Sequence, residues 1–267
     1  MRQITVLLIM GQLIFSHGIF GQVNSPASGD NKFLIVPEGQ SRSFMFTNRL
    51  GLFYYGETSL PNTSQFHGLS YLTHKFLEDY LIEIAGDDVS RSKAEVHLLG
   101  EKLIRYFKSM SVEEEVAIVD TLPILMIKIR SKQKTPLAVS PLISGSNQKE
   151  DYILEWSPSD KILQVARKHH LVRNDDANYP VWIGIYAYPE GEYITTELEG
   201  ATPKNRLVDN KSFCPGKINI YLEKEVVIFF IIGDSKNDLL KIRNQMLKNL
   251  NIDLKKPNSQ IEGVRQA

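Results

Sequence analysis

Short apolar stretches separated by turn residues recur along most of this chain, and several of them alternate with a period of two. Residues 124–130 place Leu125, Ile127 and Ile129 on one side and more polar residues on the other, and residues 217–222 alternate in the same way. Neighbouring side chains of a strand point to opposite faces, so this period predicts half-buried strands. Many such strands at near-regular spacing favour a mainly β protein, a large antiparallel β-sandwich.

Two further segments are apolar on both faces. Residues 226–232 form a continuous apolar run, which predicts a strand buried on both sides. Residues 181–188 alternate aromatic with aliphatic side chains. This pattern is typical of a central strand, or of a strand that presents one face as a contact surface.

The C-terminal part of the sequence predicts a helix that closes the sandwich. Ser235 or Asn237 can cap residues 238–250, where apolar residues follow helical spacing and Asp238 suits the first turn. Residues 90–108 fit a second helix, although 96–107 also fit a pair of strands.

The first residues have the layout of a secretory signal peptide. Arg2 precedes an apolar run over 4–15, and the small residues Ser16, Gly18 and Gly21 follow. The run is too short to span a membrane comfortably. We therefore expect an exported, periplasmic or extracellular protein, with an uncleaved N-terminal anchor as the alternative.

These patterns predict four parts of the chain. They are a signal peptide (1–22), a flexible leader (23–32), the β-sandwich (33–234), and a C-terminal helix with a polar tail (235–267).

Composition and motifs exclude several function classes. The chain has 31 basic and 31 acidic residues, so we expect no nucleic-acid partner and no membrane partner after signal cleavage. Its one cysteine, Cys214, rules out an internal disulfide framework. The sequence has no glycine-rich phosphate loop, nucleophile elbow or zinc-binding helix motif. We expect no cofactor, no metal site and no catalytic residue, and we interpret the acidic clusters 87–88, 113–115 and 175–176 as solvated turns.

Residues 51–69 combine aromatic residues with glycines, an asparagine and a histidine. Aromatic faces beside amide or imidazole groups suit the C–H faces and hydroxyls of a sugar. The candidate carbohydrate- or interdomain-contact residues are Tyr54, Tyr55, Asn62, Phe66 and His67. The alternative is a structural corner, in which Asn62 bonds the backbone and His67 fills a polar site in the core.

The same segment resembles the N-terminal domain of the bacterial and archaeal type of glycogen debranching enzyme. The matching residues are Asn48, Gly51, Asn62, Thr63, His67, Gly68 and Leu69, with Phe66 in place of the family's tyrosine. A second, weaker match covers residues 209–222 around Pro215 and Gly216, and the resemblance spans about residues 33–240. Ser64 and Gln65 stand where the family has basic residues.

The resemblance implies a β-sandwich that precedes an (α/α) toroid, and the toroid carries the catalytic carboxylates of an amylo-α-1,6-glucosidase. We expect this chain to lack the toroid and to be inactive alone. It is then a non-catalytic domain that supports a glycoside hydrolase catalytic domain or binds α-glucan. The alternative is an exported structural or interaction module with no carbohydrate role.

Overall fold

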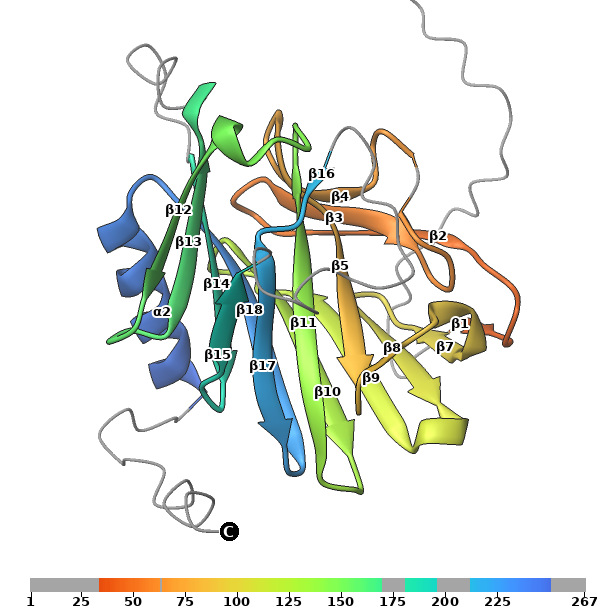
Figure 1. The fold of residues 1–267 in the computed structure, drawn as a ribbon. Coiled ribbons are helices and arrows are strands. Elements are labelled where there is room, and N and C mark those ends of the chain that lie inside the picture. Colours follow the sequence, from red (N-terminus) through yellow and green to blue (C-terminus); the bar gives the residue numbers. More distant parts are fainter. Residues whose placement is uncertain (1–33, 63, 170–180, 196–211, 251–267) are drawn as a thin grey trace, which may run out of the picture. The chain divides into compact units, whose positions relative to one another are not determined.

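Two antiparallel sheets make up most of the residues described by the computed structural model, which are 34–62, 64–169, 181–195 and 212–250 (Figure 1). Each sheet has nine strands among these residues, so the predicted β-sandwich is confirmed. The predicted signal peptide, the leader and the polar tail lie outside the described residues.

The strands of the first sheet follow a spatial order that differs from their order in the sequence. They are β1 (Leu34–Val36), β7 (Glu95–Leu98), β8 (Lys102–Phe107), β9 (Val112–Ile118), β10 (Ile124–Ser131), β18 (Glu225–Gly233), β14 (Trp182–Tyr188), β13 (Ile162–Arg167) and β12 (Tyr152–Ser157).

The second sheet is built from the remaining strands. In spatial order they are β15 (Glu192–Thr195), β17 (Gly216–Leu222), β11 (Thr135–Ser144), β5 (His74–Ile84), β4 (Gly68–Tyr71), β3 (Leu52–Glu57) and β2 (Ser43–Thr47), while β16 (Ser212–Phe213) pairs with β11 and β6 (Asp87–Asp88) pairs with β5.

The main core lies between the two sheets and follows the alternation of the strands. In β10, Leu125, Ile127 and Ile129 face this core, as predicted, and Ile127 pairs with Ile228 of the neighbouring β18. Successive side chains of a strand alternate between faces, so the other half of each strand in the first sheet faces away from the second sheet.

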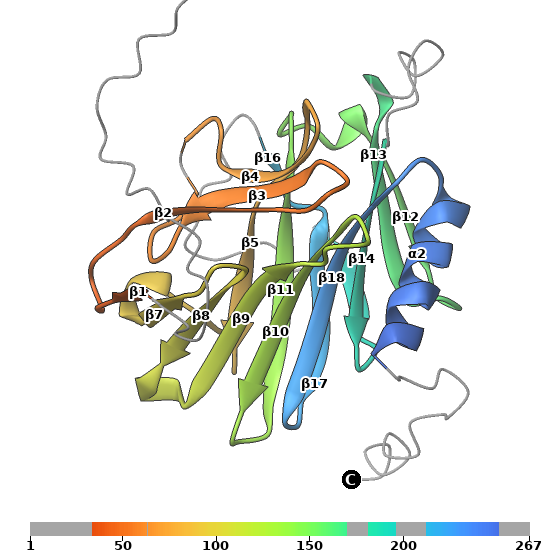
Figure 2. The same cartoon turned by 180° about the vertical axis from the view of Figure 1, so that it is seen from behind.

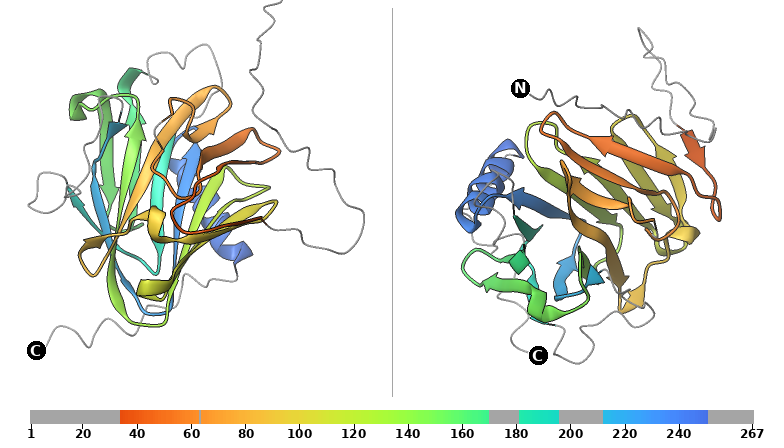
Figure 3. Two further views of the ribbon diagram at one scale, coloured as in Figure 1. Left: turned by 90° about the vertical axis from the view of Figure 1, so that its right-hand side faces the viewer. Right: turned by 90° about the horizontal axis from the view of Figure 1, so that it is seen from above.

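Helix α2 (Lys236–Asn249) covers part of that outer face, alongside β14 and β18 (Figures 2 and 3). Its Leu239 and Leu247 are buried in a second core with Phe229 and Tyr186. Strand β18 is therefore apolar on both faces because one face meets the second sheet and the other meets the helix. The expectation for 226–232 is confirmed, and 181–188 forms a central strand.

The helix begins where the sequence predicted. The Ser235 hydroxyl accepts a hydrogen bond of 3.2 Å from the Asp238 backbone N–H, which satisfies one of the unpaired donors of the first turn. Gly184 lies beneath the helix, where a Cβ atom would come within 3.1 Å of Leu239. The glycine therefore permits the helix to pack closely on the sheet.

Two sequence expectations are wrong. Residues 90–108 are not an α-helix but a short 3₁₀ turn followed by the strand pair β7 and β8, which was the alternative interpretation. The acidic cluster 113–115 is not a solvated turn, because it lies inside β9 and Glu114 points into the core. In both segments a strand carries a charged residue, Arg105 or Glu114, at an inward-facing position. Residues 175–176 lie outside the described part of the chain.

The second family-like segment begins strand β17. Gly216 has a φ of +147°, and a Cβ atom there would collide with the backbone oxygen of Ile194 on β15. Only glycine fits this close approach between neighbouring strands. Cys214, just before it, is buried, and burial raises the pKa of its thiol to about 11.

Candidate functional site

Asn48, the first residue of the motif, joins the two sheets. Its side-chain amide donates to the backbone oxygens of Val119 (2.9 Å) and Leu122 (3.0 Å), next to the turn before β10. Its side-chain oxygen accepts from the backbone N–H groups of Leu50 and Leu52. Every polar atom of this side chain therefore serves the turn into β3 or the contact between the sheets.

Asn62 has a similar structural role at the other end of β3. Its side-chain amide donates to the backbone oxygen of Glu78 (3.0 Å) and to the Tyr54 hydroxyl (3.4 Å), while its oxygen accepts from the Glu57 N–H (3.4 Å). A Cβ atom on Gly56 would come within 2.6 Å of that oxygen. The glycine thus makes room for the asparagine, which holds the loop against β5.

His67 closes the corner and is only 5% exposed. Its Nδ1 accepts from the Ser64 backbone N–H at 3.3 Å, so the neutral ring carries its proton on Nε2, which lies 4.0 Å from a Glu57 carboxylate oxygen. The edge of its ring meets Tyr55, with 4.8 Å between the centroids. Gly68 follows with a φ of +118°, and a Cβ atom there would collide with the carbonyl oxygen of Leu77.

The five predicted contact residues therefore separate into two groups. The Tyr54 ring is 1% exposed and lies in the core, so in this structure it presents no face to solvent. Asn62 and His67 make the internal contacts of a structural corner, which was the alternative interpretation. Tyr55 is half-buried and Phe66 is 66% exposed, so these two rings remain available to a partner. Thr63 lies outside the described residues.

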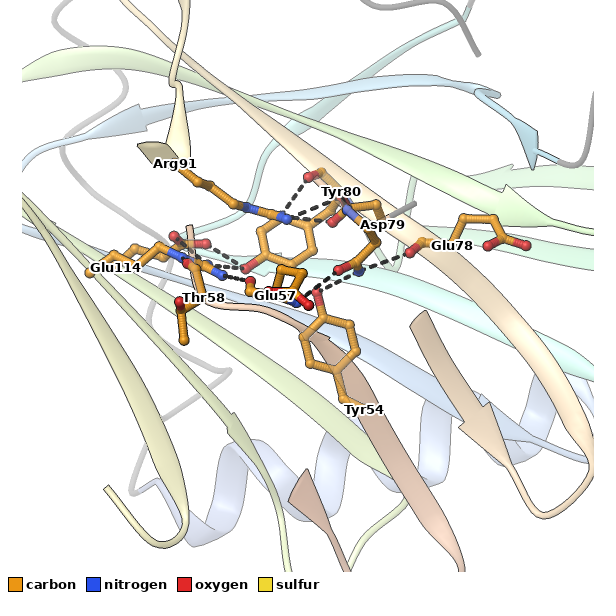
Figure 4. Close-up of polar contacts among 10 residues, drawn as sticks. Tyr54, Glu57, Thr58, Glu78, Asp79, Tyr80, Arg91 and Glu114 are labelled. Carbon is orange, nitrogen blue, oxygen red and sulfur yellow. Dashed lines mark hydrogen bonds and ion pairs between the residues drawn. The ribbon is translucent and has the colours of Figure 1, made fainter. Parts of the chain in front are cut away.

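The sequence did not predict a polar cluster that is buried between the sheets (Figure 4). Arg105 on β8 is fully buried and donates to Glu114 on the neighbouring β9 (2.9 Å) and to the backbone oxygens of Thr58 (2.6 Å) and Glu57 (3.2 Å). The Tyr80 hydroxyl of β5 donates to the other Glu114 oxygen at 2.5 Å. One guanidinium group thus joins the first sheet to the end of β3 in the second.

A second part of this cluster forms hydrogen bonds with backbone carbonyl groups along one edge of β5. On the edge away from β11, β4 pairs with β5 only as far as Leu77 and β6 pairs with it only at Glu83 and Ile84, so the backbone carbonyls between them on this edge have no strand partner. Instead they accept from side chains and a loop. The bonds are Asn62 Nδ2 to Glu78 O (3.0 Å), Arg91 to Tyr80 O (2.9 Å) and the Val89 N–H to Ile82 O (2.9 Å). These contacts replace the missing ladder and cover an edge that would otherwise be free to pair.

Asp79 holds the arginine of this edge in place. Its carboxylate makes contacts of 2.8 and 3.1 Å with the Arg91 guanidinium, and it also accepts from the backbone N–H groups of Tyr80 (2.9 Å) and Asn62 (3.1 Å). The guanidinium lies over the Tyr80 ring, 4.6 Å from its centroid. Figure 4 shows the Arg91 side chain reaching Asp79 beside the Tyr80 ring.

The charges in this cluster are balanced. Burial alone would raise the pKa of Glu114, but the Arg105 and Arg91 charges and the hydrogen bonds from Tyr80 and Arg105 outweigh it and hold that pKa below its ordinary value. Burial, together with the nearby Asp79 charge, raises the pKa of Tyr54 to about 12. Glu114 is therefore ionised and Tyr54 protonated at neutral pH, which suits a structural network.

The lowered pKa of Glu114 predicts an acid-sensitive contribution to stability. The unfolded chain takes up this proton near pH 4.5, before the folded protein does, so the free energy of unfolding falls as the pH drops from about 5 through the lower, folded-state pKa. In urea titrations between pH 6 and 3, we expect wild type to lose up to about 1.4 kcal/mol per pH unit more than Glu114→Gln. Glu113→Gln, on the other face of the same strand, is the matched control. Equal slopes for wild type and Glu114→Gln would contradict the assignment.

Two features are absent from the described residues. No helix in this part of the chain is long and apolar enough to cross a membrane. No group of three or more histidine, cysteine, aspartate or glutamate side chains is placed there to hold a metal ion.

Comparisons with known proteins find likeness in structure but not in sequence. No family model matches the sequence, and no curated protein matches it. The chain is similar to a bacterial glucoamylase in complex with acarbose, with 12% identity, a TM-score of 0.48, and coverage of 85% of this chain and 37% of the other. It is also similar to a family GH92 α-mannosidase from Bacteroides thetaiotaomicron (10% identity, TM-score 0.39, 82% and 32% coverage).

A third similar structure is a putative kojibiose phosphorylase from the human microbiome (9% identity, TM-score 0.28, 82% and 28% coverage). The chain therefore spans well under half the length of each of these proteins.

Proposed function

We propose that this chain is a non-catalytic β-sandwich module of the glycoside hydrolase type, and that it docks on a catalytic domain. The docking surface would be the outer β3 face, which we define as Met45, Tyr55 and Phe66. This proposal rests on how the motif residues are used in the structure.

The proposal is supported by the fact that the polar residues of the motif make contacts within the protein. Asn48, Asn62 and His67 direct their polar atoms to the backbone or to neighbouring side chains. A sugar site needs polar groups that converge beside an aromatic face. Because these groups are already engaged, the motif supports a role in shaping the corner more than a role in holding a glucan.

Met45 and Phe66 of the outer β3 face are exposed, and Tyr55 is half-buried. Met45 is the cross-strand partner of Tyr55 and is 63% exposed, while Phe66 precedes His67, whose ring meets Tyr55. Methionine and aromatic residues are enriched where proteins contact one another. An apolar face of this kind favours a protein partner, and without one it favours weak self-association.

Self-association of the isolated chain tests this surface. Sedimentation velocity should show reversible association of wild type at about 0.1–1 mM, a concentration range that corresponds to a weak contact. The double variant Met45→Ser with Phe66→Ser should remain monomeric over the same range. Tyr221→Ser, which removes another exposed apolar side chain from the outer face of β17, should behave as wild type.

Two results would argue against the docking surface. One is a wild type that stays monomeric throughout the range. The other is association that the Met45 and Phe66 substitutions leave unchanged.

Export of the protein is a second part of the proposal, supported by the layout of residues 1–22. N-terminal sequencing of the secreted or periplasmic protein should begin after Gly18, or near Gly21 or Gln22. Retention of Met1 on protein recovered with the membrane fraction would instead indicate an uncleaved anchor.

A further inference from the structure

A cavity of about 490 Å³ opens beside the exposed edge of β5. Its apolar walls include Leu60, Leu81, Val89 and Phe107, and the buried cluster contributes Tyr80, Arg91 and Glu114. This volume falls in the range of small-molecule sites, about 300–1,000 Å³. Such sites have mostly apolar linings with a few placed polar groups, and the residues around this cavity fit that description.

The charges around the cavity disfavour an anionic ligand. Arg91 is paired with Asp79, and Arg105, which lies behind Glu114, is paired with that carboxylate. The remaining carboxylate among the lining residues is Asp88, which is exposed. The lining therefore offers no uncompensated positive charge for a phosphate, sulfate or carboxylate.

Hydroxyl groups along the lining provide partners for a neutral polar group. The Ser59 hydroxyl is buried and has no hydrogen-bond partner among the described residues. The hydroxyls of Ser90 and Ser92 bond each other at 2.9 Å on the exposed side. The Ser90 and Ser92 hydroxyls each keep a lone pair that can accept from a ligand hydroxyl, whereas the Ser59 oxygen is closed to solvent in this structure.

We propose that this cavity binds a small uncharged molecule with a mainly apolar body and one or two hydroxyl groups. None of the residues lining the cavity belongs to the outer β3 face, so ligand binding can be tested independently of docking. The cavity wall consists partly of the segment 88–92, which is held to β5 by the Val89 N–H and the Arg91 side chain. Binding should therefore also hold this segment more firmly against the strand.

Titration with 2-naphthol, followed by two-dimensional ¹H–¹⁵N NMR, tests the site. We expect saturable shifts concentrated in residues 80–82 and 88–92, with a dissociation constant of about 1 mM or tighter. The anion 2-naphthalenesulfonate, which has the same ring system, should bind at least about tenfold more weakly. Val89→Trp, which fills the cavity, should weaken 2-naphthol binding at least about tenfold.

A second variant that blocks the cavity keeps the experiment interpretable if Val89→Trp does not fold. Ser90 is exposed, so Ser90→Trp should fold even if Val89→Trp does not, and it should also weaken binding. Tyr221→Trp, away from the cavity, should bind as wild type does. The proposal is overturned if 2-naphthol causes no shifts in these segments, if Ser90→Trp folds and binds as wild type does, or if the sulfonate binds equally well.

Discussion

Replacing Arg105 with methionine is expected to lower the free energy of unfolding by about 3–5 kcal/mol, as found for buried ion pairs that lose one partner. The substitution leaves the Glu114 carboxylate buried without its cation, and it removes the donors to the backbone oxygens of Glu57 and Thr58. Urea unfolding at pH 7, monitored by tryptophan fluorescence and circular dichroism, measures the loss.

Two further variants separate this effect from a general loss of charge. Arg130 pairs with Glu113 and Glu225 on a partly exposed surface, so Arg130→Met should cost no more than about 1 kcal/mol. Combining Arg105→Met with Glu114→Gln removes the stranded charge and should recover part of the loss. A loss below about 1 kcal/mol for Arg105→Met would mean that the network does not hold the sheets together.

Replacing Gly68 with alanine is expected to cost about 3 kcal/mol or more, since it combines overpacking with an unfavourable backbone conformation. The new Cβ atom would collide with the carbonyl oxygen of Leu77, which is part of the β4–β5 pairing and cannot rotate away. Thermal and urea unfolding of the purified variant measure this cost.

Gly86 provides a matched control. It also has a positive φ, +87°, but no atom lies within 4 Å of the position that a Cβ would occupy. Gly86→Ala should therefore cost only about 1 kcal/mol, which is the conformational part alone. If the two alanine variants lose the same stability, the close approach at Gly68 does not constrain the fold.

The sequence predicted well the strands that are apolar on one face only, the strand that is buried on both faces, and the start of the helix. The alternation at Leu125, Ile127 and Ile129 identified β10 because its inward residues are all apolar. The run over 226–232 identified β18, and the cap at Ser235 identified the start of α2. Hydrophobic periodicity and capping chemistry are local signals, so a single sequence contains them.

The buried network escaped prediction because its residues break the local pattern. Arg105 lies between the inward residues Leu103 and Phe107, and Glu114 lies within three consecutive glutamates. A charged residue at an inward position looks like a solvated one until its partner is known. Arg105 and Glu114 are cross-strand neighbours, but their bonds to Thr58 and Tyr80 depend on the packing of the two sheets.

The residues of the 48–69 segment were singled out from the sequence, but their structural role was not predicted. Asn48 and Asn62 bond the backbone, His67 fills the corner, and Gly68 permits two strands to approach closely. Residues of this kind recur where a fold needs them, whatever the protein does. In this chain these residues therefore indicate a corner of the fold more directly than a ligand site.

We propose that this corner supports the fold and does not bind glucan. Titration of the purified chain with maltoheptaose, monitored by ¹H–¹⁵N NMR and by intrinsic fluorescence, tests it most directly. We predict no saturable change up to about 10 mM sugar, a limit that corresponds to a binding free energy weaker than about −3 kcal/mol. Saturable shifts around Tyr55 and Phe66 that Tyr55→Ala and Phe66→Ala abolish, while both variants remain folded, would contradict the claim and identify a sugar-binding face.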